Sequence, residues 1–88
     1  MTTAKRKPKM IRMTMRDGVT YEAKTAKGLV EKMRLAGIFT AGKDNVEYMA
    51  MVRRLAKTTH GATIRTTTED DFVASLATEG MATVTTIH

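Results

Sequence analysis

Hydrophobic and polar residues alternate along two short stretches near the start of the chain. A strand over residues 10–16 (MIRMTMR) places three apolar side chains on one face: Ile11, Met13 and Met15. A strand over residues 19–24 (VTYEAK) does the same with Val19, Tyr21 and Ala23. Asp17-Gly18 lies between them and is the preferred pair for a two-residue hairpin turn, in which both central residues have a positive φ. The pattern predicts a β-hairpin.

The next stretch, residues 25–37, has the spacing of an amphipathic helix. Its apolar residues recur every three or four positions: Ala26, Leu29, Val30, Met33 and Ala36. Thr25 is the predicted N-cap, and Gly37 is predicted to end the helix in a left-handed conformation. Gly28 costs about 1 kcal/mol relative to alanine inside a helix. We therefore expect the helix backbone to approach the sheet closely at Gly28.

Two more helices are predicted further along the chain. The second begins at Asp44, which forms a capping box with Glu47, and it ends at His60-Gly61. Its apolar stripe is wide enough to predict burial on two sides: Val46, Tyr48, Met49, Met51, Val52, Leu55 and Ala56. The third helix begins at Thr67 or Thr68 and ends at Gly80. Its predicted apolar face consists of Phe72, Val73, Leu76 and Ala77.

Two β-branched stretches complete the predicted sheet. Residues 62–66 (ATIRT) predict a third strand with Ile64 inward, and residues 81–87 (MATVTTI) predict a closing strand. The register of the closing strand stays open, since either Ala82 and Val84 or Met81 and Ile87 would face inward. The order β-β-α-α-β-α-β predicts an α/β (α+β) fold, a two-layer sandwich of a mainly antiparallel sheet with helices on one face.

The other face of this sheet is predicted to be polar, rich in threonine and net basic. Its members are Arg12, Thr14, Arg16, Thr20, Glu22, Lys24, Thr63 and Arg65. The whole chain of 88 residues has a formal charge of +6, of which Lys5, Arg6, Lys7 and Lys9 supply four, so 6 − 4 = +2 remains for the rest. We therefore expect a flexible basic arm over residues 1–9 and one small domain over residues 10–88.

The composition narrows the class of protein. Hydrophobic residues make up 42% and charged residues 27%, as in ordinary globular domains. The chain has no cysteine, which excludes disulfides and thiolate metal sites. Neither a secretory signal nor a run of about 20 apolar residues is found. These features predict a cytoplasmic protein without a membrane partner.

Three patterns that resemble catalytic or ligand sites have simpler explanations. Residues 37–44 (GIFTAGKD) match G-x-x-x-x-G-K, but a predicted helix precedes them, and Asp44 stands where a nucleotide-binding loop has Ser or Thr. Glu69, Asp70 and Asp71 begin a helix, whose dipole they stabilise while pointing in different directions. Ser75 is the only serine and is expected to face solvent from the middle of a helix. We therefore expect a non-enzymatic protein without a metal or cofactor.

Two kinds of partner remain open, a host protein and nucleic acid. Nucleic acid would be bound by the basic arm and the basic sheet face, whose cations suit phosphates and make binding salt-dependent. The predicted sheet face, however, lacks the aromatic platforms of single-strand readers. The small size, the eight methionines and the mixed Thr/Arg surface favour a protein-interaction module of unspecified oligomeric state. The candidate partner-binding residues are Lys5, Arg6, Lys7, Lys9, Arg12, Arg16, Lys24, Arg53, Arg54, Lys57 and Arg65.

A pattern over residues 10–80 combines several short stretches. They are DGVTYEAKTAKGLVEKMR, the later EYM with Val52, the IRT of residues 64–66 and the run Phe72–Leu76–Gly80. This pattern resembles small uncharacterised proteins encoded by bacteriophages and integrated mobile elements. The resemblance rests on turn, cap and core positions, and it carries no activity or binding residue. It implies an accessory or inhibitory protein that acts on host machinery, to which the basic arm is an addition.

Overall fold

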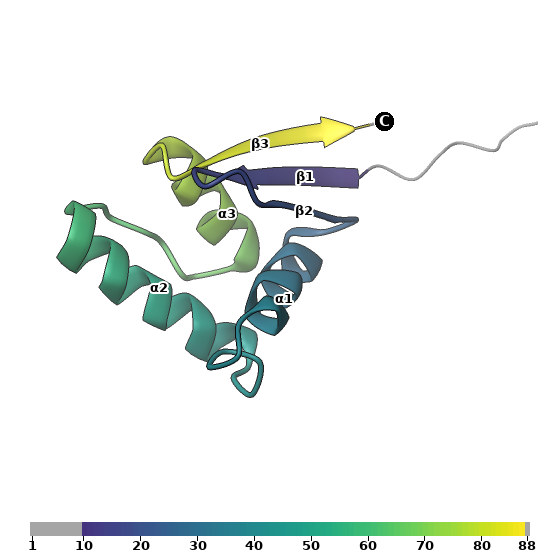
Figure 1. The fold of residues 1–88 in the computed structure, drawn as a ribbon. Helices are drawn as coiled ribbons and strands as arrows, with labels where there is room; N and C mark the ends of the chain where they lie inside the picture. The colour runs from purple at the N-terminus through teal and green to yellow at the C-terminus, as the bar shows by residue number, and fades with distance from the viewer. Residues whose placement is uncertain (1–9, 88) are drawn as a thin grey trace, which may run out of the picture.

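Three strands and three helices make up the domain in the computed structural model, which describes residues 10–87 (Figure 1). The elements follow in the order β1 (Met10–Met15), β2 (Thr20–Ala23), α1 (Ala26–Ala36), α2 (Asn45–His60), α3 (Glu69–Thr78) and β3 (Ala82–Ile87). The strands form one antiparallel sheet in the order β2-β1-β3. The helices lie on one side of this sheet, which confirms the predicted α/β two-layer fold. The predicted arm over residues 1–9 lies outside the described residues.

The predicted β-hairpin is confirmed, but its turn has three residues instead of two. The pairs Ile11–Ala23 and Met13–Tyr21 place apolar residues opposite each other, which a two-residue turn at Asp17-Gly18 would not allow. The Gly18 N–H donates to the Met15 carbonyl oxygen (2.9 Å), and of the turn residues only Gly18 has a positive φ, of 94°. The hydrophobic pattern therefore sets the register, and a type I turn followed by a left-handed glycine closes the loop.

The register of β3, which the sequence leaves open, is decided by its pairing with β1. Val84 lies opposite Met13 and Ala82 lies opposite Met15, so both join the face that the helices cover. Ala82 is buried, and Val84 packs against the core from the margin of the sheet. Of the two open alternatives, the structure selects Ala82 and Val84.

The predicted strand over residues 62–66 is wrong, because this segment pairs with no strand of the described sheet. It runs between α2 and α3, where the Arg65 N–H donates to the Ser75 Oγ (3.0 Å) instead of a neighbouring strand. The inward position of Ile64 is confirmed, since its side chain is buried in the core. The segment therefore serves as an extended link between α2 and α3, which Ile64 anchors in the core.

Most of the predicted helix ends are confirmed. Thr25 and Thr68 cap α1 and α3, and Asp44 with Glu47 forms the predicted capping box of α2. Gly61 and Gly80 follow α2 and α3 with positive φ, of 65° and 74°.

The prediction for Gly37 is wrong, since its φ is −101°. The Thr40 Oγ1 donates to the Arg34 carbonyl oxygen (2.6 Å), which satisfies a carbonyl of the last helical turn without a left-handed glycine.

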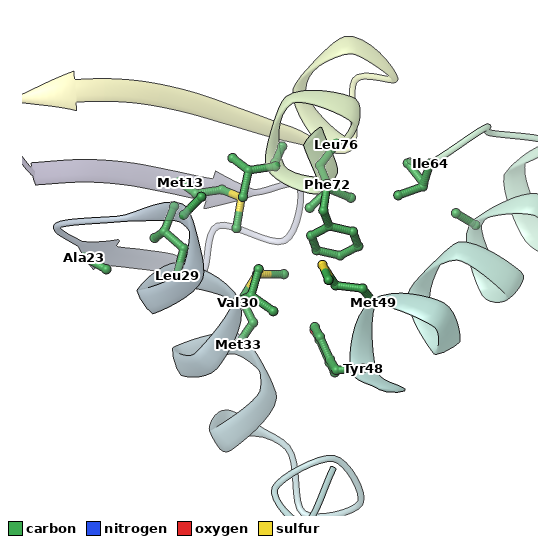
Figure 2. Packing of buried hydrophobic residues seen from close by; sticks show 14 of the residues in the cluster. Met13, Ala23, Leu29, Val30, Met33, Tyr48, Met49, Ile64, Phe72 and Leu76 are labelled. Carbon is green, nitrogen blue, oxygen red and sulfur yellow. The ribbon is translucent and has the colours of Figure 1, made fainter. Parts of the chain in front are cut away.

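The hydrophobic core lies between the inner face of the sheet and the three helices (Figure 2). Its largest fully buried side chains are Phe72, Met13, Leu29, Ile64, Leu76 and Val30. Tyr48 contributes from α2, with its ring 6.5 Å from that of Phe72 in an edge-to-face arrangement. The close approach predicted at Gly28 is confirmed, because a Cβ there would lie 3.0 Å from the Cβ of Ala23 in β2.

Five apolar side chains that the sequence predicts to face inward are exposed, and one of them is Ala36 at the end of α1. Val19 is exposed in the hairpin, and Ala77 is exposed on α3. Val46 and Leu55 are exposed on α2, which contradicts burial of this helix on two sides. The reason is that α2 packs against α1 and the core only with the side that carries Tyr48, Met49 and Ala56.

Candidate protein-binding surface at the α1–α2 connection

Large apolar side chains are exposed around the connection between α1 and α2. Their exposed fractions are 89% for Phe39, 87% for Ile38, 70% for Val46 and 56% for Leu35. We call these four residues the apolar tip. Ile38 and Phe39 belong to the connection itself, Leu35 to the last turn of α1 and Val46 to the first turn of α2. Exposed apolar residues that gather in one place are typical of interaction surfaces, whereas single ones are common on any protein.

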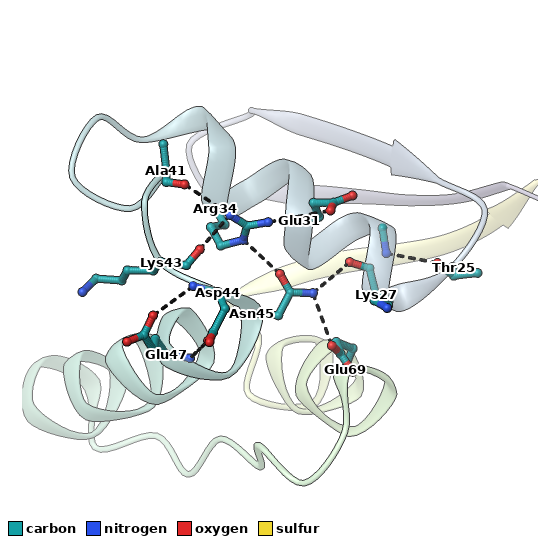
Figure 3. A network of polar contacts seen from close by, with 11 residues as sticks. Thr25, Lys27, Glu31, Arg34, Ala41, Lys43, Asp44, Asn45, Glu47 and Glu69 are labelled. Carbon is teal, nitrogen blue, oxygen red and sulfur yellow. Dashed lines mark hydrogen bonds and ion pairs between the residues drawn. The ribbon is translucent and has the colours of Figure 1, made fainter.

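The connection that carries the apolar tip is held in place by Arg34 (Figure 3). Its Nη1 donates to the carbonyl oxygens of Lys43 (2.7 Å) and Ala41 (3.2 Å), and its Nε donates to the Asn45 Oδ1 (3.0 Å). The Arg34 side chain is only 15% exposed, and its bonds to Lys43 and Asn45 are partly shielded from water, whereas the bond to Ala41 is exposed. A connection held by a partly buried guanidinium presents its apolar side chains at little cost in conformational entropy.

The beginning of α2 is tied to both other helices. The Asn45 Nδ2 donates to the Lys27 carbonyl oxygen of α1 (3.3 Å) and to the Glu69 Oε2 at the start of α3 (3.2 Å). The Asp44 Oδ1 accepts from the Glu47 N–H (2.8 Å), and the Asp44 N–H donates back to the Glu47 Oε1 (3.0 Å). These bonds set the position of Val46 relative to the connection.

Positively charged side chains follow Val46 of the apolar tip along the outward side of α2. Val46, Ala50, Arg54 and Lys57 are three or four residues apart and therefore follow one face of the helix. Within residues 10–87 neither Arg53, Arg54 nor Lys57 forms an ion pair. We call these three residues the cationic face.

Two shallow hollows lie along the cationic face. One, of about 440 Å³, is lined by Ala50, Arg53, Arg54, Lys57 and Thr58. The other, of about 140 Å³, is lined by Arg53, Lys57, Ala62, Thr63 and Ile64. From Val46 to Lys57 the helix rises by about 16 Å, which is the length over which the surface changes from apolar to cationic.

The remaining predicted basic residues are spread over the molecule. The Arg12 Nε lies 2.6 Å from the Glu22 Oε2, and the Arg65 Nη2 lies 3.9 Å from the Asp71 Oδ1. Arg16 belongs to the hairpin loop, and Lys24 lies between β2 and α1. Lys5, Arg6, Lys7 and Lys9 lie outside the described residues.

The predicted net basic character of the sheet face is wrong for the paired strands. Arg12 lies directly opposite Glu22, and their charges cancel. The rest of the face is rich in threonine as predicted, from Thr14, Thr20, Thr83 and Thr85. Arg65 is not on it, because residues 62–66 do not form a strand.

Among the described residues, the buried polar side chain of Ser75 has structural partners. Ser75 is buried rather than facing solvent, since its Oγ donates to the Asp71 carbonyl oxygen (2.8 Å) and accepts the Arg65 N–H. Burial raises the pKa of Tyr48, and the nearby Tyr21 raises it further. Over residues 10–87, no three His, Asp or Glu side chains come together as metal ligands, and no helix has the length and apolar character needed to cross a membrane.

Comparison with protein-family models gives no match for this chain, and curated proteins and solved structures give none either. The resemblance to proteins of phages and mobile elements therefore stays a prediction.

Sequence reasoning found the cationic face but missed the apolar tip. The segment GIFTAG matches part of a phosphate-binding pattern, and the structure confirms the two features that argue against such a loop, a preceding helix and Asp44 as an N-cap. A signal was present in Ile38-Phe39, two large apolar residues between glycines and outside any helical or strand period.

Proposed function

We propose that this chain is a non-enzymatic protein-interaction module that docks through the apolar tip. The exposure of Phe39 carries the proposal, because an aromatic side chain that is 89% exposed gains most from entering a pocket on a partner. The bonds from Arg34 support it, since they hold Phe39 and Ile38 on an ordered connection. The partner is a protein whose surface offers an apolar pocket.

The cationic face adds a requirement on the charge of this partner. Arg53, Arg54 and Lys57 follow the same side of α2 as Val46 and have no carboxylate partner among residues 10–87. A partner with acidic residues beside its apolar pocket satisfies them and is attracted from a distance. The resemblance to phage proteins makes a bacterial host lysate the first source of partners, and an accessory or inhibitory role on host machinery the first to test.

The proposal is tested by affinity capture with matched variants. The wild-type chain is expected to retain a protein that Phe39→Ser and Ile38→Ser lose, with or without nuclease. Leu55→Ser is the control, because Leu55 is also exposed on α2 but lies about two and a half turns from Val46, on the opposite side of the helix. Retention of the same proteins by all variants, or no retained protein at low and moderate salt, would contradict the proposal.

Nucleic acid is the second candidate partner, and the unpaired cations of α2 are the observation that favours it. In this case affinity for a generic duplex falls steeply with salt, and replacement of Arg53, Arg54 and Lys57 by alanine lowers the slope of log affinity against log salt by about 0.9 for each lost phosphate contact. Deletion of residues 1–9 removes up to four more cations. Fluorescence anisotropy over a salt series checks this, and an absence of binding at low ionic strength excludes it.

A further inference from the structure

The two margins of the sheet are protected to very different degrees. β2 is four residues long, and the Lys32 Nζ of α1 donates to the outward carbonyl oxygen of Glu22. β3 is six residues long, with the sequence ATVTTI, and contains neither a charge nor a proline. Figure 1 shows β3 at the outer margin of the sheet, with no described element beyond it. Proteins usually guard such edges with lysine, proline or a covering helix, so β3 is the unguarded edge of this sheet.

The alternation of hydrogen bonds along the strands determines which backbone N–H and C=O groups of β3 have no partner in the described sheet. The Met15 N–H donates to the Val19 carbonyl oxygen (2.8 Å). Because backbone groups alternate along a strand, the N–H and C=O groups of Met15, Met13 and Ile11 point toward β2. The residues between them, Arg12 and Thr14, turn toward β3 and pair with Thr85 and Thr83. The N–H and C=O groups of the intervening β3 residues therefore point outward: Ala82, Val84 and Thr86.

We propose that β3 pairs antiparallel with β3 of a second copy of this chain, with the two-fold axis at Val84. In this register Val84 meets Val84 of the other copy, and Ala82 meets Thr86 in both directions. All six outward groups of each strand then lie in hydrogen-bonding pairs. Shifting the register by two residues leaves part of these groups without partners. The result is a continuous six-stranded sheet with the helices of both copies on one face.

The side chains of β3 are complementary to themselves in this register. On the open face, Thr83 of each copy lies opposite Thr85 of the other, a cross-strand pair of the kind that Thr14 and Thr20 already form, with their Oγ1 atoms 3.2 Å apart. On the inner face, Val84 is only half-buried, whereas its neighbour Met13 on the central strand is fully buried. A second copy covers the side of Val84 that the sheet margin leaves open.

A second copy is favoured over an unrelated peptide for two reasons. Its β3 is already an extended strand in a folded sheet, so pairing does not require a disordered segment to become ordered. Moreover, β3 is uncharged, so two positively charged chains can pair there without placing like charges next to each other. A contact of one short strand falls in the range of weak interfaces, below about 1,200 Å² of total buried surface. The dimer is therefore expected to be reversible and dependent on concentration.

The register is tested by disulfide cross-linking. Because the chain has no native cysteine, only the introduced cysteines can form disulfides. Thr83→Cys and Thr85→Cys are exposed on the open face, where substitution leaves the core intact. An equimolar mixture of the two variants is expected to form disulfide-linked dimers under mild oxidation faster than either variant alone. Thr58→Cys on α2 is the control for random collision. Equal rates for the mixture and for the single variants would overturn the register.

The dimer itself is tested by sedimentation of the full chain over a concentration series. The wild type is expected to show a concentration-dependent shift from monomer to dimer, which Val84→Pro abolishes. Proline is tolerated where an edge N–H faces solvent, so this variant is expected to keep the far-UV spectrum of the wild type. Thr86→Pro removes a second outward N–H and gives an independent check. A wild-type chain that remains monomeric at every concentration overturns the inference. Phe39→Ser should dimerise normally, which separates this result from the proposed function.

Discussion

Replacement of Arg34 by methionine is the sharpest test of how the α1–α2 connection is held. Methionine keeps much of the length and apolar volume of the side chain but removes the guanidinium. Three hydrogen bonds are lost, to the carbonyl oxygens of Ala41 and Lys43 and to the Asn45 Oδ1. The ion pair with Glu31 (3.7 Å) is lost as well, but Glu31 is more than half exposed, so that pair contributes little.

The size of the effect follows from which of these acceptors water can reach. The bonds to Lys43 and Asn45 are part-buried, and a hydrogen bond from a charged donor is worth about 1.5–3 kcal/mol at most. The bond to Ala41 is exposed, so water replaces it at little cost. We therefore expect Arg34→Met to lower the free energy of unfolding by about 2 kcal/mol. For a domain of this size that is a large share of the total stability.

Urea denaturation measures the loss of stability, and amide hydrogen exchange locates it. The amides of Ala41 and Lys43 donate to carbonyl oxygens within the connection, so their exchange should accelerate more than that of Phe72 in α3. Arg54→Met is the matched control, since Arg54 is exposed and forms no ion pair within residues 10–87; it should change stability by less than about 0.5 kcal/mol. A loss of similar size in both variants, or unchanged exchange in the connection, would refute the structural role of Arg34.

Three further predictions follow from packing and burial. Phe72→Ala should lower the free energy of unfolding by about 3–5 kcal/mol because Phe72 is fully buried; thermal denaturation checks this, and a loss under about 1 kcal/mol would contradict it. Gly28→Ala should destabilise the chain despite the helix propensity of alanine, because the new Cβ lies 3.0 Å from that of Ala23; the loss should shrink in an Ala23→Gly background, and an equal loss in both backgrounds would argue against the contact. Stability should fall as the pH rises above the ordinary tyrosine pKa of 10.0, because the pKa of Tyr48 is raised in the folded state, so that the unfolded chain releases this proton first. Tyr48→Phe should remove that part of the pH dependence in denaturant titrations, and an unchanged pH profile would show that Tyr48 is not its source.

Features encoded by neighbouring residues were predictable from the sequence. The hairpin, the capping box of Asp44 and Glu47, and the glycines after α2 and α3 depend on contacts a few residues apart. The close approach at Gly28 was also predictable, because glycine destabilises a helix and is therefore expected where the helix backbone packs closely against another element. The cations of α2 were predictable as exposed residues near a helix end, although their lack of partners was not.

The tertiary structure decided what depends on residues far apart in the chain. The pairing of β3 with β1 settled the register of Val84, and the bond from the Arg65 N–H to the Ser75 Oγ holds residues 62–66 at α3 instead of in the sheet. The contact of Arg12 with Glu22 removed the positive charge predicted for the sheet face. Exposure of Val46 in the apolar tip depends on how α2 packs against α1, which the apolar stripe of α2 does not specify. Local hydrogen bonds and the periodicity of apolar residues thus defined most of the helices and strands. The packing of segments that are distant in the chain determined which side chains remain exposed and free to bind.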